Sequence, residues 1–142
     1  IEFANFKFIK EDVRKTHFPD NYFDAVVAVS TLEHIGLSGR YGMDEDPAGD
    51  KKAVDEMKRI LKSNGIILLT VPFGKAKIIK PYHRIYDGVL IRQLVKGLEI
   101  EKDEYCMQDS RNDWYKCFKE EAERVEARSD RSALCLLKMV KK

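Results

Sequence analysis

Short apolar runs recur along the sequence, separated by turn-forming residues and by longer stretches with helical spacing. Two of these runs, 25–29 and 66–71, are unbroken and rich in β-branched residues. Such runs are typical of strands that are buried on both faces of a parallel sheet. Residues 5–9 and 98–107 alternate between apolar and polar, and 133–140 forms a last apolar run, so each predicts a further strand.

Three other stretches have the apolar spacing of amphipathic helices. Between Asp50, a suitable N-cap, and the stop at Asn64-Gly65, apolar residues recur every three or four positions. A second predicted helix begins after Asp87 and ends at Gly97, and a third spans 113–128. Because strands and helices alternate with short connections, the sequence predicts an α/β fold with right-handed parallel crossovers.

Composition limits the classes of protein to which the chain can belong. With 142 residues, 44% hydrophobic and 35% charged, it matches one globular domain. No apolar run approaches the roughly 20 residues that a membrane helix needs, and a net charge of +2 is too small to indicate nucleic acid or a membrane as partner. The three cysteines lack C-x-x-C spacing, which favours reduced thiols and a cytoplasmic location.

The densest cluster of chemically able side chains directly follows the strand predicted at 25–29. Ser30, Thr31, Glu33 and His34 would lie at the carboxyl end of that strand, where open α/β sheets place their ligands. Two long predicted loops would overhang the same edge of the sheet, at 36–49 and 75–86.

Four pieces of the sequence stand in a recognisable order and spacing: Asp12-Val13, 23–27 with Leu32-Glu33-His34, 57–65 and 66–72. Together they resemble the second half of a class I S-adenosylmethionine-dependent methyltransferase. More narrowly, four motifs are similar to an uncharacterised subgroup of that superfamily: Leu32-Glu33-His34, 39–42, 46–50 and 83–86. The resemblance implies a Rossmann-like, doubly wound and mostly parallel sheet with a C-terminal antiparallel hairpin, whose third to seventh strands are present here.

In that family a glycine-rich loop and an acidic strand end, both of which hold the cofactor, precede the part matched here. Neither is found in this sequence, so the resemblance implies that 1–142 is a single methyltransferase-like domain, truncated at its N-terminus and inactive alone. Loss of the upstream strands would leave open sheet edges, which predicts aggregation or pairing into a homo-oligomer.

The resemblance also assigns candidate contacts for S-adenosylmethionine. Asp12 and the Val13 N–H would meet the donor and acceptor edge of adenine, whereas the alternative for Asp12 is a solvated turn. Ser30, Thr31 and Leu32 follow the fourth strand of the family, where the methyl group and the substrate are positioned. In the alternative, Ser30 and Thr31 cap a helix and Leu32 packs in the core.

Glu33 and His34 are the predicted catalytic pair. Methyl transfer to oxygen or nitrogen is an in-line displacement, and a base helps when the acceptor must lose a proton. Histidine suits that role near neutral pH. Some relatives hold a divalent metal with Glu-x-x-Glu-His, but Ser30 occupies the first position here, so no metal is predicted. In the alternative, the pair only orders the following loop through hydrogen bonds.

The predicted substrate contacts are basic and aromatic residues of the two loops: Arg40, Tyr41, His83, Arg84 and Tyr86. Arginine and tyrosine suit an anionic or sugar-like acceptor. In the alternative, an arginine pairs with one of three nearby acidic residues and holds a lid: Asp44, Glu45 or Asp46. The nearby lysines are predicted to form a solvated face: Lys75, Lys77 and Lys80.

The sequence therefore predicts an S-adenosylmethionine-dependent methyltransferase that acts on a small or carbohydrate-like acceptor. One alternative is a non-catalytic binding or assembly module with a degenerate methyltransferase fold. Another is a different nucleotide-binding enzyme, such as a dehydrogenase, but this would leave Asp12 and the Leu32-Glu33-His34 cluster without an obvious role.

Overall fold

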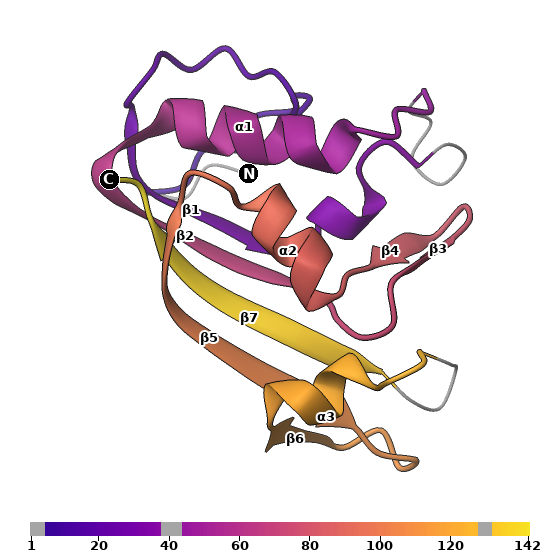
Figure 1. The fold of residues 1–142 in the computed structure, drawn as a ribbon. Helices are drawn as coiled ribbons and strands as arrows, with labels where there is room; N and C mark the ends of the chain where they lie inside the picture. The colour runs from indigo at the N-terminus through magenta and orange to yellow at the C-terminus, as the bar shows by residue number, and fades with distance from the viewer. Residues whose placement is uncertain (1–4, 38–43, 128–131) are drawn as a thin grey trace.

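A five-stranded sheet organises the chain, and the computed structural model describes residues 5–37, 44–127 and 132–142 (Figure 1). The strands are β1 (Phe23–Val29), β2 (Leu61–Pro72), β5 (Glu99–Gln108), β6 (Trp114–Cys117) and β7 (Ala133–Val140), in the spatial order β1-β2-β7-β5-β6. A separate hairpin pairs β3 (Lys77–Ile79) with β4 (His83–Ile85). The helical segments are a 3-10 turn, η1 (Leu32–His34), and the helices α1 (Gly49–Ile60), α2 (Gly88–Leu94) and α3 (Lys119–Glu123).

The strand directions follow from one parallel and three antiparallel pairings. β1 runs parallel to β2, with Val27 opposite Leu68. β7 runs antiparallel to both β2 and β5, and β6 runs antiparallel to β5. β1, β2 and β5 therefore share one direction, and β7 is inserted between β2 and β5 in the opposite direction. This arrangement confirms the predicted Rossmann-like α/β fold with an antiparallel pair of strands near the C-terminus.

The hydrophobic core lies between the sheet and its helices, which cover the same face (Figure 1). β2 places alternate side chains in this core, and apolar residues of each helix pack against them. The core members from these elements are Ile67, Leu69 and Val71 of β2, Val54 and Met57 of α1, Ile91 and Leu94 of α2, and Ala122 of α3.

The two predicted helix caps have different outcomes. Asp87 caps α2, because its carboxylate accepts hydrogen bonds from the Val89 and Leu90 N–H groups at 3.0 and 2.8 Å. Asp50 does not cap α1, since the N-cap position is Ala48 and Asp50 lies in the first turn. Its carboxylate is used in the polar cluster described below.

The opposite face of the sheet carries exposed apolar side chains. Val27 and Val29 of β1 are 62% and 63% exposed, and Leu68 of β2 is 44% exposed. Within β1 only Ala28 is buried, so the prediction that 25–29 is buried on both faces was wrong. Because no helix of the described ranges covers this face, the outward side chains of an unbroken apolar run stay in contact with solvent.

Three further predictions of secondary structure were wrong. The helix predicted to stop at Asn64-Gly65 ends at Ile60, because β2 begins at Leu61, which pairs with Phe23 of β1. Residues 5–9 form no strand of the described sheet: Phe6 makes only a single β-bridge, 7–9 have no regular secondary structure, and Phe6 and Phe8 are exposed. The helix predicted over 113–128 is divided into β6 and α3. Pairing with β5, in which Trp114 lies opposite Gln108, gives β6 its hydrogen-bond partners and overrides the helical spacing.

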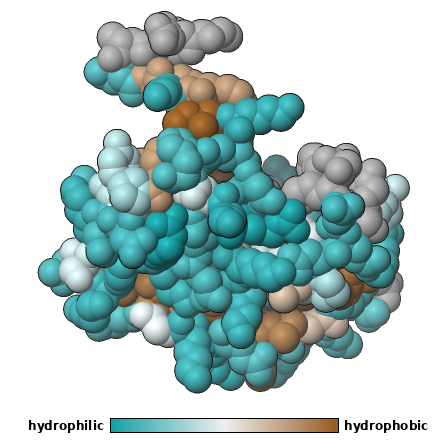
Figure 2. Space-filling model, turned by 90° about the horizontal axis from the view of Figure 1, so that it is seen from above, coloured by the Kyte–Doolittle hydropathy of each residue, from teal (hydrophilic) through white to brown (hydrophobic). Residues whose placement is uncertain are grey.

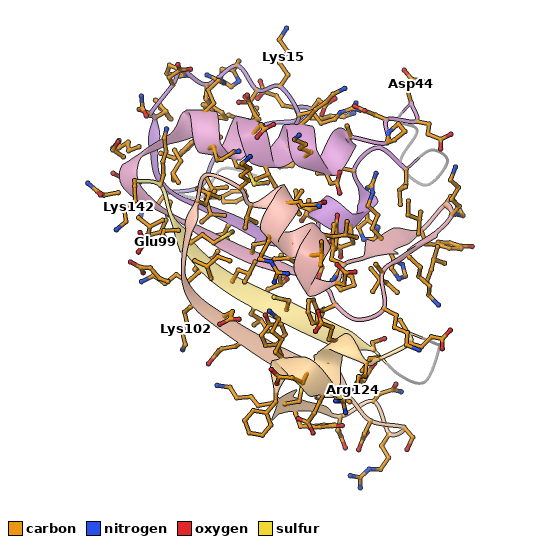
Figure 3. All side chains as sticks on the ribbon, viewed as in Figure 1. Lys15, Asp44, Glu99, Lys102, Arg124 and Lys142 are labelled. Carbon is orange, nitrogen blue, oxygen red and sulfur yellow. The ribbon has the colours of Figure 1, made fainter. Side chains whose placement is uncertain are left out.

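The outer surface around α1 is mainly hydrophilic, with scattered apolar patches (Figure 2). Charged side chains such as Lys15, Asp44 and Arg124 point away from the ribbon (Figure 3). The lysines predicted to form a solvated face are exposed: Lys75, Lys77 and Lys80. Within the described ranges, no helix has the length and apolar character needed to cross a membrane.

We expect the exposed apolar face of the sheet, which carries Val27 and Val29, to cause self-association. Replacing Val27 and Val29 by lysine puts two charges on the edge strand β1, which opposes pairing between copies. In sedimentation velocity, the double variant should be monomeric at concentrations where the unchanged protein associates. Val89 is also exposed, but lies on α2, so Val89→Lys is the matched control and should associate like the unchanged protein. Equal association of all three proteins would contradict this expectation.

Candidate functional site

A sharp turn at Ser30 ends β1 and begins the candidate site. Ser30 has a positive φ of 44°, and its N–H donates to the Thr70 carbonyl and Oγ1 at 3.1 and 3.0 Å. These bonds hold the ends of β1 and β2 together. The Thr31 hydroxyl donates to the Val29 carbonyl at 2.9 Å, and η1 has no side-chain cap. The alternative of helix capping is therefore not observed for Thr31.

The turn η1 directs two side chains inward. Leu32 is fully buried in the hydrophobic core, and Glu33 is only 2% exposed. The Glu33 Oε2 atom has no hydrogen-bond partner among the described residues. Burial raises the pKa of the Glu33 carboxyl above its usual range, and the neighbouring His34 offsets part of that effect.

His34 lies between Glu33 and the β3–β4 hairpin. Its Nδ1 is 2.5 Å from the Tyr82 carbonyl oxygen. Since a carbonyl only accepts, Nδ1 carries the proton in the tautomer that this geometry assigns, and Nε2 is the acceptor. Nε2 lies 3.8 Å from Glu33 Oε1, and the His34 ring meets His83 edge-on at 6.3 Å between centroids. The predicted residues His34 and His83 are thus brought together.

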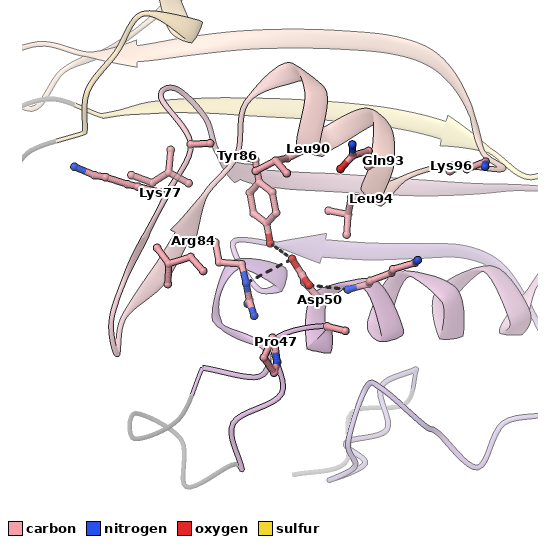
Figure 4. Close-up of a pocket in the computed structure, with 14 residues that line it drawn as sticks. Pro47, Asp50, Lys77, Arg84, Tyr86, Leu90, Gln93, Leu94 and Lys96 are labelled. Atoms are coloured by element: carbon pink, nitrogen blue, oxygen red, sulfur yellow. Dashed lines mark hydrogen bonds and ion pairs between the residues drawn. The ribbon is translucent and has the colours of Figure 1, made fainter.

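A second group of polar residues is buried next to η1. Arg84 is 6% exposed, and its Nη1 donates to the Ile35 carbonyl at 2.6 Å. Its Nε lies 3.6 Å from Asp50 Oδ2, which also accepts a hydrogen bond from the Tyr86 hydroxyl at 2.9 Å. Figure 4 shows Arg84 and Tyr86 reaching toward Asp50. Burial raises the pKa of the Tyr86 hydroxyl, and the neighbouring Asp50 carboxylate raises it further. Arg84 therefore pairs with Asp50 rather than with the acidic residues suggested by the sequence.

A cavity of about 710 Å³ opens beside this group, between α1, α2 and the β3–β4 hairpin. Arg84, Tyr86 and Asp50 line it, whereas Glu33 and His34 do not. The structure thus divides the predicted catalytic and substrate residues into two neighbouring places. Arg84 joins them, because it lines the cavity and also holds the backbone that follows His34.

Asp12 lies outside this cavity, on the segment that precedes β1. Its carboxylate accepts bonds from Arg14 Nε and Nη2 at 3.0 and 2.7 Å, and Arg14 lowers the pKa of Asp12. Arg14 Nη1 continues to Asp46 at 3.3 Å, and the Asp46 N–H donates to the Gly36 carbonyl at 2.9 Å. These contacts link the segment around Asp12 to the backbone that follows η1. Among the described residues, the Val13 N–H has no hydrogen-bond acceptor.

Arg40 and Tyr41, the remaining predicted substrate residues, lie outside the described residues. Within the described ranges, no group of three or more metal-binding side chains is close enough to hold a metal ion.

The role of Asp50 and a second polar contact near α1 were not predicted from the sequence. Glu56 of α1 accepts bonds from the Thr16 N–H and hydroxyl, both at 2.7 Å, and from Arg59. Arg59 lowers the pKa of Glu56 to about 2, with Thr16 contributing. The sequence pointed to Asp50 through its place in the motif 46–50, but this motif does not predict that Asp50 contacts Arg84 or Tyr86.

Comparison with known proteins shows which family the chain belongs to. A family model described as "Caenorhabditis protein of unknown function, DUF268" matches residues 7–139. The chain belongs to the DUF268 family. This DUF268 chain is 27% identical over 103 residues to the ubiquinone/menaquinone biosynthesis C-methyltransferase UbiE of Coxiella burnetii, with 72% of the chain and 36% of UbiE covered. The chain therefore spans about a third of the length of this curated relative.

Solved structures resemble the DUF268 chain in fold. A putative methyltransferase from Bacillus halodurans matches with a TM-score of 0.63 and 15% identity, over 95% of this chain and 77% of that one. The PH0226 protein of Pyrococcus horikoshii matches with a TM-score of 0.59 and 16% identity, over 98% and 61% of the two chains. The DUF268 chain has the class I S-adenosylmethionine-dependent methyltransferase fold, as the sequence resemblance implied.

We expect Glu33→Gln to stabilise the protein at neutral and alkaline pH. Because burial raises the folded-state pKa, the protonated carboxyl is favoured at low pH, and stability is lost as pH rises through that pKa. The glutamine variant avoids this loss. Urea unfolding should give similar free energies for both proteins below the unfolded pKa, about 4.3, and a higher value for the variant at pH 8.

Glu101 provides a control of opposite sign for this experiment. Its pKa is lowered by the Lys138 ammonium, so its stabilising effect is present above the unfolded pKa and lost as pH falls. Glu101→Gln should therefore slightly reduce stability at neutral pH. A Glu33→Gln variant that is less stable than the unchanged protein at pH 8 would contradict the expected cost of burying Glu33.

Proposed function

We propose that this DUF268 chain is the substrate-facing part of an S-adenosylmethionine-dependent methyltransferase. The observation that carries the proposal is the buried Glu33 beside His34 at the carboxyl end of β1, within the methyltransferase fold. The relative UbiE, named a C-methyltransferase, supports the same reaction class. We further propose a small or carbohydrate-like acceptor, a cytoplasmic location, and dependence on chain beyond these residues for activity.

The cofactor would be held between the segment around Asp12 and the turn that follows β1. The Val13 N–H and the Ser30 carbonyl have no partners among the described residues, so the first is available to the edge of an adenine ring and the second to the amino group of the cofactor. The Asp12 carboxylate, oriented by Arg14, adds an acceptor beside the Val13 N–H. The Thr31 hydroxyl is exposed nearby, whereas Leu32 can contribute only its backbone, because its side chain is buried in the core. The donors and acceptors therefore fit a nucleoside.

Methyl transfer would place the acceptor next to His34. When bound, S-adenosylmethionine supplies a methyl group on a positively charged sulfur. His34 Nε2 would take the proton that the acceptor oxygen or nitrogen loses when it is methylated. The Tyr82 carbonyl keeps the proton on Nδ1, so Nε2 is the basic nitrogen of the ring. Glu33, 3.8 Å away, stabilises the imidazolium that forms.

The acceptor would be held by residues of the β3–β4 hairpin and of the loop before α1. His83 lies against His34, whereas Arg84 and Tyr86 line the adjacent cavity. Arg40 and Tyr41 remain proposed contacts from the loop. Self-association through the edge strand β1 remains a proposal as well, motivated by the exposure of Val27 and Val29.

Asp12→Ala should weaken cofactor binding. Loss of one hydrogen bond to a polar ring edge costs about 1–3 kcal/mol, so calorimetry with S-adenosylhomocysteine on the full-length protein should show roughly a 5- to 150-fold higher Kd. Asp24 is an exposed partner of Lys62 at the start of β1, and Asp24→Ala should leave the Kd unchanged. Unchanged affinity in Asp12→Ala would remove Asp12 from the site. Tighter binding of a nicotinamide dinucleotide than of S-adenosylhomocysteine would instead favour a dehydrogenase.

His34→Ala should slow methyl transfer by about 10²- to 10⁴-fold, the usual contribution of a positioned base. The measurement is release of S-adenosylhomocysteine with a panel of small hydroxyl, amine and sugar acceptors. His17 is 59% exposed and bonded to Glu11, so His17→Ala is the matched control. Affinity for S-adenosylhomocysteine should be retained in both variants. An unchanged rate in His34→Ala would assign His34 to ordering of the loop.

A further inference from the structure

The cavity between α1, α2 and the β3–β4 hairpin has the size of a small-molecule site. Its volume of about 710 Å³ lies within the range of roughly 300–1,000 Å³ that is usual for ligand pockets. Its walls come from three elements that are separate in sequence (Figure 4). The first turn of α1, the hairpin and one side of α2 therefore enclose a space that a ligand can enter.

Most of the wall is apolar. α2 contributes Leu90 and Leu94, and the hairpin contributes Ile78 and Ile85. Leu90 and Ile78 are 39% and 56% exposed, so the cavity offers hydrophobic surface to solvent. An apolar ligand body would release water from these side chains, which favours binding in proportion to the apolar surface covered. A free sugar would gain much less from such walls.

The charged residues of the cavity are predominantly positive. Lys51, Lys77 and Lys96 line it, and none of them forms an ion pair among the described residues, although Lys77 Nζ donates to the Ala127 carbonyl at 3.1 Å. Asp50 supplies one negative charge, but its oxygens are already used by the Tyr86 hydroxyl, the Lys51 N–H and the nearby Arg84. The cavity therefore presents uncompensated positive charge, which attracts an anion.

Arg84 lines this positive cavity and carries a buried donor. Its Nη2 has no hydrogen-bond partner among the described residues, although the side chain is only 7% exposed. An unpaired donor on a buried cation is costly, and an anionic oxygen is the partner that satisfies it best. A planar guanidinium binds carboxylate and phosphate groups particularly well.

We propose that this cavity binds a small amphipathic anion, a molecule with an apolar body and one carboxylate or phosphate end. The anionic end lies toward Arg84, and the apolar body lies along Leu90, Leu94 and Ile78. The identification of this anion as the methyl acceptor rests on the proposed function, because Arg84 also fixes the backbone next to His34. Binding itself rests on the cavity alone.

Titration of the full-length protein with decanoate tests the proposal, and decan-1-ol serves as the matched neutral probe. Chemical shifts of the Arg84 side-chain N–H groups report the position of the anion. Decanoate should bind with a Kd at least about tenfold lower than that of decan-1-ol and should shift the Arg84 signals, because only decanoate carries a charge. Equal affinity for both probes, or unmoved Arg84 signals at saturation, would overturn the anionic end of the proposal.

Leu90→Glu tests the location of the site without removing a buried residue. A carboxylate on this wall repels the anion and should weaken decanoate binding by at least about tenfold. Val89 is the matched control, since it is 52% exposed on the same helix but does not line the cavity. Val89→Glu should bind decanoate as the unchanged protein does. Equal binding by both variants would overturn the proposed site.

Titration of the same samples with S-adenosylhomocysteine separates this inference from the proposed function. Retained binding of S-adenosylhomocysteine with no decanoate binding overturns the cavity proposal and leaves the methyltransferase proposal standing. Decanoate binding that depends on Leu90, without any binding of S-adenosylhomocysteine, supports the cavity as an anion site and contradicts the methyltransferase proposal.

Discussion

Burial of the Arg84 guanidinium is the constraint on which the geometry of the site depends. A buried cation is costly unless its donors are satisfied, and the fold brings two partners to this one. The Ile35 carbonyl comes from the end of η1, and the Asp50 carboxylate comes from the first turn of α1. Arg84 itself lies on β4. One side chain therefore fixes three elements relative to one another, and removal of a partner from a buried pair typically costs about 3–5 kcal/mol.

The part of the site that Arg84 holds in place, around Ser30 and Glu33, has several features that a purely structural role would not need. Ser30 holds a left-handed backbone conformation, and Glu33 is a buried carboxyl with one oxygen unpartnered among the described residues. Such costs are tolerated where the surrounding structure compensates for them, and they often mark functional sites. Here the compensation comes from the bonds of Ser30 to Thr70 and of Arg84 to Ile35. Stability and proposed chemistry thus use the same hydrogen bonds.

Elements with a strong local pattern were predictable from the sequence. The unbroken run of β2, the apolar spacing of α1 and the Asp87 cap of α2 each depend on residues close together in the chain. The wrong predictions concerned features that depend on distant neighbours. The face of β1 that carries Val27 is exposed because no described helix covers it, and β6 is a strand because it pairs with β5.

The same distinction applies to the candidate site. The position of Ser30 to His34 at the end of β1 followed from the strand itself, and His83 was placed near His34 by the expected overhang of two loops. The pairing of Asp50 with Arg84 and Tyr86 could not be predicted, because α1 and β4 meet only in the folded chain. The cavity lined by Leu90 and Lys96 was missed for the same reason.

A crystal structure of the full-length protein with S-adenosylhomocysteine tests the central claim most directly. That claim is that the segment around Asp12 and the turn that carries Glu33 and His34 form one binding site for a nucleoside. The account predicts adenine against Asp12 and the Val13 N–H, with the sulfur facing the turn from Ser30 to His34. Density for the ligand at another place, or none at saturating concentration, would contradict it.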